Sequence, residues 1–252
     1  MIATIKSSIY TITMTTLMVF VLLSCTPHKE YISISGNALG TNVQVKCQTD
    51  VSSEKLIEVI RNVDSDAKAS MSIFNPESLL SKINRGETDS LDSHISHLIG
   101  VSRELYDMSN GAYDITVKPL TDAWGFGRDE RNATPNIDSL LQFIGLDKIE
   151  ICNEHLVRSD YRTQIDLNSI AKGYTVDLLA QRLEELDIDN YMVNIGGEIR
   201  CRGVNASGHN WSIGIETPYD GNVAMDSIEK IIKVSDCAMA TSGNYRRFYR
   251  TE

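Results

Sequence analysis

The 252-residue sequence lacks the short motifs that identify many nucleotide-binding and hydrolytic enzymes. No Gly-x-Gly-x-x-Gly follows a predicted strand and no Walker loop occurs, so the standard nucleotide-binding folds are not indicated. The five histidines lie in polar, loop-like stretches and no Gly-x-Ser-x-Gly is present, which argues against a Ser-His-Asp hydrolase. Runs of Lys and Arg are also missing and the formal net charge is -10, so nucleic acid is not an expected partner.

Cysteine is scarce, with five residues in the whole chain. Apart from Cys25 near the start, Cys47, Cys152, Cys201 and Cys237 include no Cys-x-x-Cys pair, so the spacing of a metal site is absent from the sequence. A disulfide is an open alternative in an oxidising compartment, but the sequence does not identify the pairing. Buried free thiols are the simpler interpretation.

The first residues have the layout of a secretory signal. One cation, Lys6, precedes an apolar run that is too short for a permanent membrane-spanning helix. The run ends in Leu22-Leu23-Ser24-Cys25, which resembles a bacterial lipobox, where cleavage precedes the cysteine and acyl chains are added to it. Each buried methylene contributes about 0.8 kcal/mol, so two or three chains would anchor the protein durably. The alternative is an ordinary cleaved signal with Cys25 as a bystander.

These features predict the organisation of the chain. We expect a signal peptide over residues 1–24, a short tether over residues 25–30 and one folded domain over residues 31–252. The protein is expected at the cell membrane, lipid-anchored through Cys25 and facing the periplasmic or extracytoplasmic side.

Hydrophobic periodicity predicts a mixture of strands and helices. Strands are expected at residues 31–35, 42–47, 148–152, 163–167, 191–195, 211–215 and 230–234, and helices over residues 56–67, 95–106, 136–144 and 170–186. Ser52 and Ser53 offer a suitable N-cap for the first helix. Because the order has no regular βαβ rhythm, we expect the α+β class rather than a doubly wound sheet.

Polar residues at the ends of apolar elements are the candidates for chemistry. Gly40, between two predicted strands, either allows close approach of a ligand or simply permits a turn. Asp114, after a helix, either accepts from a ligand or bonds the backbone of its own turn. Gly196 and Gly197 end a strand and allow close approach of a flat ligand or of another backbone.

The segment Ile165-Asp-Leu-Asn-Ser-Ile-Ala-Lys-Gly173 is the most informative. A strand is expected to end at Asp166 and a helix to begin near Ser169, so free N–H groups and the helix dipole would favour a phosphate there. Lys172, one turn into the helix, would add positive charge. The alternative is an Asp or Ser N-cap with a solvated lysine beside it.

Taken together and in order, these segments resemble the ApbE family, the FAD:protein FMN transferases. The resemblance is carried by Gly36-Asn-Ala-Leu-Gly-Thr41, Met71-Ser-Ile-Phe-Asn-Pro-Glu-Ser78 with Asn84, Gly111-Ala-Tyr-Asp-Ile-Thr116, Pro119-Leu120, Trp124-Gly-Phe-Gly127, Ile165 to Tyr174, Asn194-Ile-Gly-Gly197 and Ala240-Thr-Ser-Gly243. Each stretch is weak alone, but their order along nearly all of the mature chain is specific.

The resemblance implies an enzyme that binds FAD as substrate with Mg²⁺, moves FMN onto a Ser or Thr hydroxyl of a client protein, and releases AMP. The client would be a subunit of a membrane electron-transport complex. The implied FAD contacts are Leu39, Phe74, Ala112, Tyr113, Asp114, Asp166 and Lys172, and Ser169 matches a metal-ligand position. Leu39 replaces the family's usual Met and Phe74 its usual Tyr, so both keep an apolar or aromatic contact. The implied fold is a mixed, largely antiparallel sheet flanked by helices.

One departure concerns the end of the chain. The family continues past the Thr-Ser-Gly motif with a Ser-His-Ile segment, whose His would be the catalytic base, and then with an acidic and Ser/Thr cluster that completes the Mg²⁺ site. No histidine follows His209 in this sequence. We therefore expect the base and the remaining metal ligands to lie beyond Glu252, and the domain to lack its C-terminal part. Two alternative functions are a lipoprotein that binds flavin without transferring it and a hydrolase that cleaves FAD to FMN and AMP.

Overall fold

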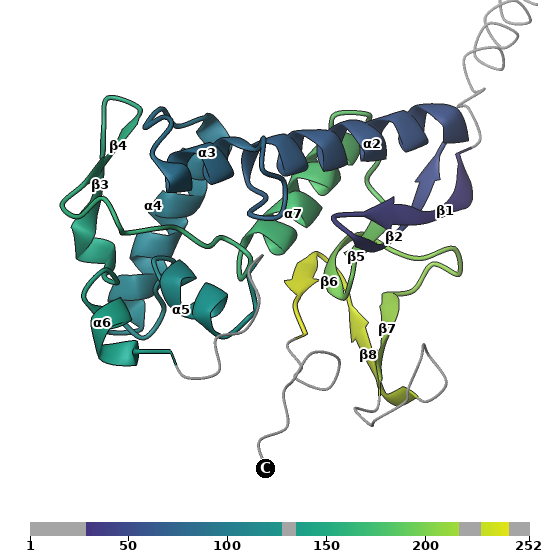
Figure 1. Ribbon diagram of the computed structural model, residues 1–252. Helices are drawn as coiled ribbons and strands as arrows, with labels where there is room; N and C mark the ends of the chain where they lie inside the picture. Colours follow the sequence, from purple (N-terminus) through teal and green to yellow (C-terminus); the bar gives the residue numbers. More distant parts are fainter. Residues whose placement is uncertain (1–28, 128–134, 217–227, 242–252) are drawn as a thin grey trace, which may run out of the picture.

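A computed structural model describes residues 29–127, 135–216 and 228–241 (Figure 1). In chain order its elements are β1 (Glu30–Ala38), β2 (Thr41–Thr49), α2 (Ser53–Ser70), α3 (Leu79–Arg85), α4 (Ser93–Met108), α5 (Lys118–Ala123), α6 (Ile137–Leu141), the 3-10 helix η1 (Leu146–Lys148), β3 (Ile149–Cys152), β4 (His155–Arg158), α7 (Ala171–Glu184), β5 (Tyr191–Ile195), β6 (Glu198–Arg202), β7 (Trp211–Glu216), β8 (Ile228–Val234) and β9 (Cys237–Met239).

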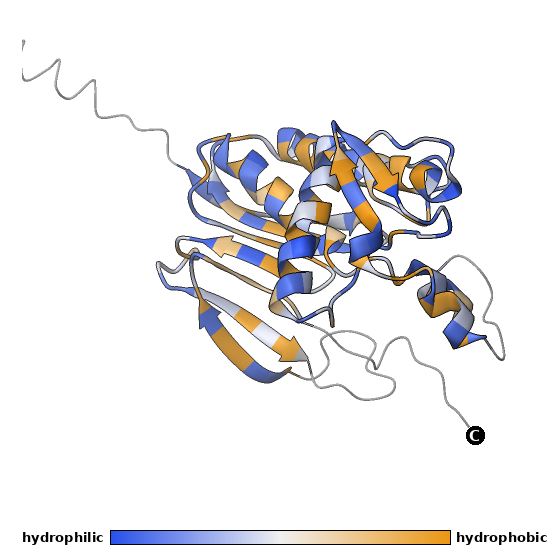
Figure 2. Ribbon diagram, turned by 90° about the vertical axis from the view of Figure 1, so that its left-hand side faces the viewer, coloured by the Kyte–Doolittle hydropathy of each residue, from blue (hydrophilic) through white to orange (hydrophobic). Residues whose placement is uncertain are grey.

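The central element is a five-stranded sheet in the order β1-β2-β5-β6-β9, and every neighbouring pair in it is antiparallel. Strand β2 pairs with β5 in the register Val43↔Ile195, which joins segments far apart in the chain. Figure 2 shows hydrophobic and hydrophilic residues alternating along the strands. Because successive side chains of a strand point to opposite sides, alternation places the apolar residues of a strand on one face. Those of β2 belong to the core on one side of the sheet, and those of β6 belong to the core on the other side.

Each face of the sheet has its own hydrophobic core. On one face, α2 and α7 cover the strands, and Leu56, Leu179 and Val193 belong to one cluster there. On the other face, Cys201 and Ile199 pack with Trp211, which comes from the separate two-stranded sheet of β7 and β8. The indole N–H of Trp211 donates to the carbonyl of Arg202 at 3.0 Å and ties this small sheet to β6.

A second part of the molecule is mainly helical. It contains α3, α4, α5, α6 and the β3–β4 hairpin, which lie together on the left of Figure 1. Helix α2 reaches both parts, because Leu56 and Ile60 belong to the sheet core whereas Ala67 and Met71, near its C-terminal end, belong to the core of the helical part. The functional site lies where these two cores meet.

The predicted α+β class and antiparallel sheet are confirmed, and the N-cap of α2 is Ser52, whose hydroxyl accepts from the backbone N–H of Lys55. The strand predicted over residues 163–167 is wrong. This segment makes only an isolated parallel bridge, Val117↔Gln164. A side chain replaces the neighbouring strand, because the Asn84 amide bonds both the N–H and the carbonyl of Ile165 at 2.8 Å.

The signal peptide over residues 1–24, Cys25 and most of the predicted tether lie outside the described residues, and β1 begins at Glu30. None of the helices within the described ranges is both long and apolar enough to span a membrane.

Candidate functional site

A cavity of about 930 Å³ opens where the C-terminal end of α2 approaches the N-terminal end of α7. Its lining divides into two walls. The α2 wall consists of Leu39, Gly40, Ala67, Lys68, Met71, Ser72, Phe74 and Asn75, and the α7 wall consists of Asp114, Val117, Thr121, Phe126, Asp166, Asn168, Ser169, Ala171, Lys172 and Thr175.

The β1–β2 turn presents Leu39 to the cavity. Leu39 and Gly40 both have a positive φ, 51° and 73°. This conformation is costly for a leucine, and such strain persists only where surrounding contacts hold it. Here the Leu39 N–H donates to Asp64 at 2.7 Å, and the second oxygen of the same carboxylate accepts from Lys68 at 2.6 Å. Gly40 therefore serves a turn, and the turn itself lines the cavity.

Phe74 stands at the end of the α2 wall, and its side chain is 52% exposed. Local hydrogen bonds fix the segment that carries it. The Ser72 hydroxyl accepts from the backbone N–H groups of Phe74 and Asn75, both at 3.2 Å, and the Asn75 amide donates to the Lys68 carbonyl. The aromatic ring of Phe74 is thus held at the cavity, and about half of its surface is not covered by other residues.

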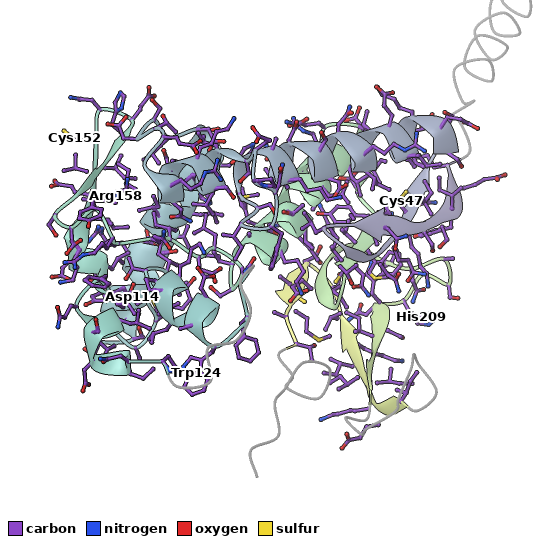
Figure 3. All side chains as sticks on the ribbon, in the orientation of Figure 1. Cys47, Asp114, Trp124, Cys152, Arg158 and His209 are labelled. Atoms are coloured by element: carbon purple, nitrogen blue, oxygen red, sulfur yellow. The ribbon has the colours of Figure 1, made fainter. Side chains whose placement is uncertain are left out.

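Asp114 lines the α7 wall, and it also bonds its own turn. One carboxylate oxygen accepts from the backbone N–H and the hydroxyl of Thr116 at 2.8 and 2.6 Å, and the other accepts from the N–H of Leu146 at 3.0 Å. Figure 3 shows Asp114 within the helical part of the molecule. The turn interpretation is confirmed for Asp114, and the carboxylate additionally joins the turn to η1.

Asp166 is buried and also lines the α7 wall. Its carboxylate accepts from the N–H of Asn168 at 2.9 Å and from the Thr121 hydroxyl at 3.0 Å, while its own N–H donates to the carbonyl of Ile115. These bonds fix Asp166 between α5 and the start of α7. A carboxylate has about four acceptor sites, so the two bonds leave it capacity for a ligand donor.

The structure contradicts the alternative interpretation, in which an Asp or Ser caps α7 and Lys172 is only solvated. The N-cap is Ile170, and no side chain caps the helix. Lys172 forms an ion pair with Glu198 at 2.6 Å, with 37% of the lysine side chain exposed. The cavity therefore has an uncapped helix N-terminus and an oriented ammonium group on one wall, an arrangement that favours an anion.

Ser169 and Tyr113 meet beside this helix start. Their hydroxyl oxygens are 3.0 Å apart, although 56 positions separate them in the chain. Ser169 lines the cavity, whereas Tyr113 and the exposed Ala112 are not among the lining residues. Of the eight predicted ligand positions, the structure thus places six on the cavity and Tyr113 in contact with one of them, and it leaves Ala112 outside the lining.

The β5–β6 turn contacts the β1–β2 hairpin and leads to the partner of Lys172. Gly196 and Gly197 have a positive φ, and a Cβ added to Gly196 would lie 2.6 Å from the Thr41 side chain. The packing interpretation is therefore correct for Gly196, which fits against the β1–β2 hairpin. The turn also sets the position of Glu198, the first residue of β6, beside Lys172.

The sequence prediction missed two charged residues. Lys68 lines the cavity. The spacing of four between Asp64 and Lys68, which puts both on one helical face, could have indicated their ion pair from the sequence. Glu198 follows the predicted glycine pair, but no pattern in the sequence joined it to Lys172. Within the described ranges, no group of three or more His, Cys, Asp or Glu side chains could hold a metal ion. The oxygen donors at the cavity, Asp166 and Ser169, are of the type that Mg²⁺ prefers.

Comparisons with known proteins agree with this geometry. Residues 39–252 match the sequence model that describes the ApbE family. The chain is 35% identical to the FAD:protein FMN transferase of Haemophilus influenzae over 248 residues, 92% of this chain and 71% of that protein, and 32% identical to that of Vibrio cholerae over 241 residues, again 92% and 71%. The fold is similar to that of the flavin transferase ApbE from Vibrio cholerae, with a TM-score of 0.78 and 31% identity over 88% of this chain and 74% of that chain.

Proposed function

Because the chain belongs to the ApbE family, we propose that it transfers FMN from FAD to a hydroxyl group of a client protein. The observation that carries the proposal is the convergence of six predicted ligand positions, from four separate stretches of the sequence, on one cavity of about 930 Å³. A cavity of this volume falls within the range of small-molecule and cofactor sites.

The cavity has groups for each part of FAD. Phe74 offers an exposed aromatic face and Leu39 an apolar contact, which suit the isoalloxazine or adenine ring. Lys172 and the uncapped start of α7 suit the pyrophosphate. Asp114 and Asp166 offer carboxylate oxygens to ligand N–H or O–H donors.

In the proposed reaction, the client hydroxyl oxygen attacks the phosphorus of the FMN half, and its proton passes to the solvent. The bond to the phosphate of the AMP half breaks, a phosphoester forms and AMP leaves with the electron pair of the broken bond. Such phosphoryl chemistry depends mainly on positioning and on neutralising negative charge. Lys172 would neutralise part of that charge, and the helix N-terminus would hold the phosphate oxygens.

We include Mg²⁺ in the proposal. The oxygen donors of Ser169 and Asp166 fit a hard cation that keeps several waters, and Ser169 would contribute its hydroxyl. When bound, the ion would add positive charge at the pyrophosphate. The acceptor would be a Ser or Thr, and the client a subunit of a membrane electron-transport complex. A lipid on Cys25 would hold the enzyme at the extracytoplasmic face of the membrane, beside such clients.

The test uses the protein together with any residues encoded after Glu252, where the base is expected. It supplies FAD, Mg²⁺ and a candidate client domain, and measures flavin fluorescence of the client after denaturing electrophoresis. We expect a fluorescent client band that increases with time, AMP release in equal amount, and loss of both with a metal chelator. Replacing the acceptor Ser or Thr of the client by Ala is the matched control.

Two outcomes would contradict the proposal. AMP release without a client would identify an FAD hydrolase, because water then replaces the hydroxyl. Tight FAD binding without AMP release, with a client that a homologous transferase does label, would identify a flavin-binding module.

A further inference from the structure

Three ion pairs join the same two elements, α7 and β6, and the longest of them joins Glu184 to Arg202 at 3.6 Å. Lys172 pairs with Glu198 at 2.6 Å at the cavity, and Asp177 pairs with Arg200 at 2.8 Å further along the helix. Only 18% of the Glu198 side chain is exposed, compared with 48% for Asp177. All three pairs tie the same elements together, but only that of Lys172 involves a residue that lines the cavity.

We propose that Glu198 is a positioning residue, which holds the Lys172 ammonium group at the cavity before FAD binds. This inference rests on the proposed function. A lysine side chain loses much rotamer freedom when it is fixed, and a partner that fixes it in the free protein removes that cost from ligand binding. Lys172 lines the cavity and Glu198 does not, so the lysine is the member of the pair that can contact a ligand there. A lysine has three N–H donors, and the carboxylate uses one of them.

The test is a double-mutant cycle on FAD affinity, measured by quenching of flavin fluorescence. We expect Glu198→Ala to weaken FAD binding by roughly 5- to 20-fold in the wild-type chain, because the lysine is no longer ordered. In a Lys172→Met background, the same substitution should not weaken binding. Asp177→Ala is the matched control, since it breaks another α7–β6 ion pair, and it should leave FAD affinity within about 2-fold.

Several results would overturn this role of Glu198. They are unchanged or tighter FAD binding in Glu198→Ala, an equal loss in the Lys172→Met background, and an equal loss in Asp177→Ala. A chain that does not bind FAD would instead contradict the proposed function. In that case, acetylation of Lys172 decides the positioning role without flavin, because the pair shields the amine. Glu198→Ala should raise the acetylation rate of Lys172 several-fold relative to Lys68, and an unchanged rate would contradict the proposal.

A separate observation concerns the thiols of β6 and β9. Cys201 and Cys237 are direct partners in the antiparallel register, so their side chains lie on the same face of the sheet. The Cys201 thiol donates to the Cys237 carbonyl at 3.6 Å, and Cys201 is buried whereas Cys237 is exposed. Directly opposed residues of an antiparallel pair lie within the distance range that a disulfide requires.

The other two described cysteines are not placed to compete. Cys47 pairs with Tyr191 and belongs to the core on the opposite face of the sheet. Cys152 lies in the β3–β4 hairpin, and Figure 3 shows it at the far end of the molecule from Cys47. Among Cys47, Cys152, Cys201 and Cys237, the fold thus brings together one pair.

We infer that Cys201 and Cys237 form a disulfide when the chain meets a small-molecule or protein disulfide as oxidant. The exposed Cys237 thiolate attacks that disulfide, one oxidant thiol leaves, and the Cys201 thiolate then displaces the second. Two electrons pass to the oxidant, whose two thiols take up the two protons. Burial raises the pKa of the Cys201 thiol to about 11, which makes Cys237 the first to react.

The bond would fasten the short edge strand β9 to the sheet. The register Ile199↔Met239 leads the chain after β9 toward Glu198, the partner of Lys172. A disulfide two positions further along β6 would therefore hold residue 240 near Glu198. It would also close the loop that contains β7 and β8, and a loop of this length loses considerable entropy in the unfolded chain when it is cross-linked.

The test incubates the chain with oxidised glutathione and maps disulfides by mass spectrometry after digestion. We expect a Cys201–Cys237 cross-linked peptide and a rise in unfolding temperature of roughly 5–10 °C that reducing agent reverses. Cys237→Ser should abolish both, and Cys152→Ser, the control at another exposed thiol, should change neither. A stable glutathione adduct on Cys237 without the cross-link, or a pairing that includes Cys47, would overturn the assignment.

Discussion

The two walls of the cavity are built in different ways. On the α2 wall, the hydrogen bonds of Ser72 and Asn75 join residues at most nine positions apart. On the α7 wall, the bonds of Asp166 and Ser169 join residues 45 and 56 positions apart. The α2 wall is thus largely a local product of one helix end. The α7 wall, which carries the charged ligand positions, depends on contacts between distant segments, so substitutions outside the cavity should damage it more.

The largest expected effect comes from Asn84→Ala. Asn84 is buried and bonds both backbone groups of Ile165, directly before Asp166, so the substitution leaves two buried polar groups without partners. We expect a loss of about 3 kcal/mol in the free energy of unfolding, measured by denaturant titration. Asn75→Ala, which removes a similar amide from the α2 wall, should cost less than about 1 kcal/mol. Equal losses would show that the two walls do not differ in this way.

Next in size is the effect of the two lysines on FAD affinity. Lys172 lies in the first turn of α7, where the helix dipole favours an anion, and Lys68 lies in the last turn of α2, where the dipole opposes one. Lys172→Met should weaken FAD binding by roughly 10- to 100-fold, the magnitude of a charged hydrogen bond. Lys68→Met should change it by less than about 3-fold. A larger loss from Lys68→Met would place the phosphates on the α2 wall.

A smaller effect is expected from Asp114→Asn. The substitution removes the charge and turns one oxygen into a donor, although both oxygens accept hydrogen bonds from Thr116 or Leu146. We expect a loss of about 1–2 kcal/mol in the free energy of unfolding. Asp64→Asn on the α2 wall should cost less than about 1 kcal/mol, because its lysine partner is nearly half exposed. Thermal unfolding of both variants measures the difference, and the reverse order would refute it.

The smallest effect should come from Phe74→Ala. With 52% of its side chain exposed, Phe74 contributes little to the core, so the unfolding temperature should move by no more than about 2 °C. FAD affinity should fall by roughly 2- to 10-fold if the ring stacks on the flavin or the adenine. Phe74→Tyr should retain wild-type affinity. An unchanged affinity in Phe74→Ala would remove the ring from the binding site.

The difference between local and long-range contacts also explains which elements the sequence predicted. Helices α2, α4 and α7 and the strands of the main hairpins were expected because periodicity and caps such as Ser52 are local signals. The short elements α3, α5, β4, β6 and β9 were not expected, because a segment of a few residues gives too little periodicity. The extended segment at Ile165 was mistaken for a strand, since nothing local reveals that Asn84 takes the place of a neighbouring strand.

For the site too, the sequence predicted residues within local motifs but not the partners that the tertiary fold brings to them. The resemblance identified Leu39, Phe74, Asp166 and Lys172, which do line one cavity. It did not reveal Glu198, because the ion pair with Lys172 exists only after β6 has paired with β5 and packed against α7. Partners of functional residues are set by the tertiary fold, so they are the part of a site that a motif leaves out.

The pairing of β2 with β5 has a consequence for the order of folding. The side chains of Gln48 and Asn190, at one end of that pair, join positions 142 residues apart. Contacts between positions so far apart slow folding, because the chain loses the entropy of closing a large loop before the contacts stabilise it. Until β5 pairs with β2, the β1–β2 hairpin has no further partner strand, and its apolar residues, such as Val43 and Val45, are exposed to aggregation during folding.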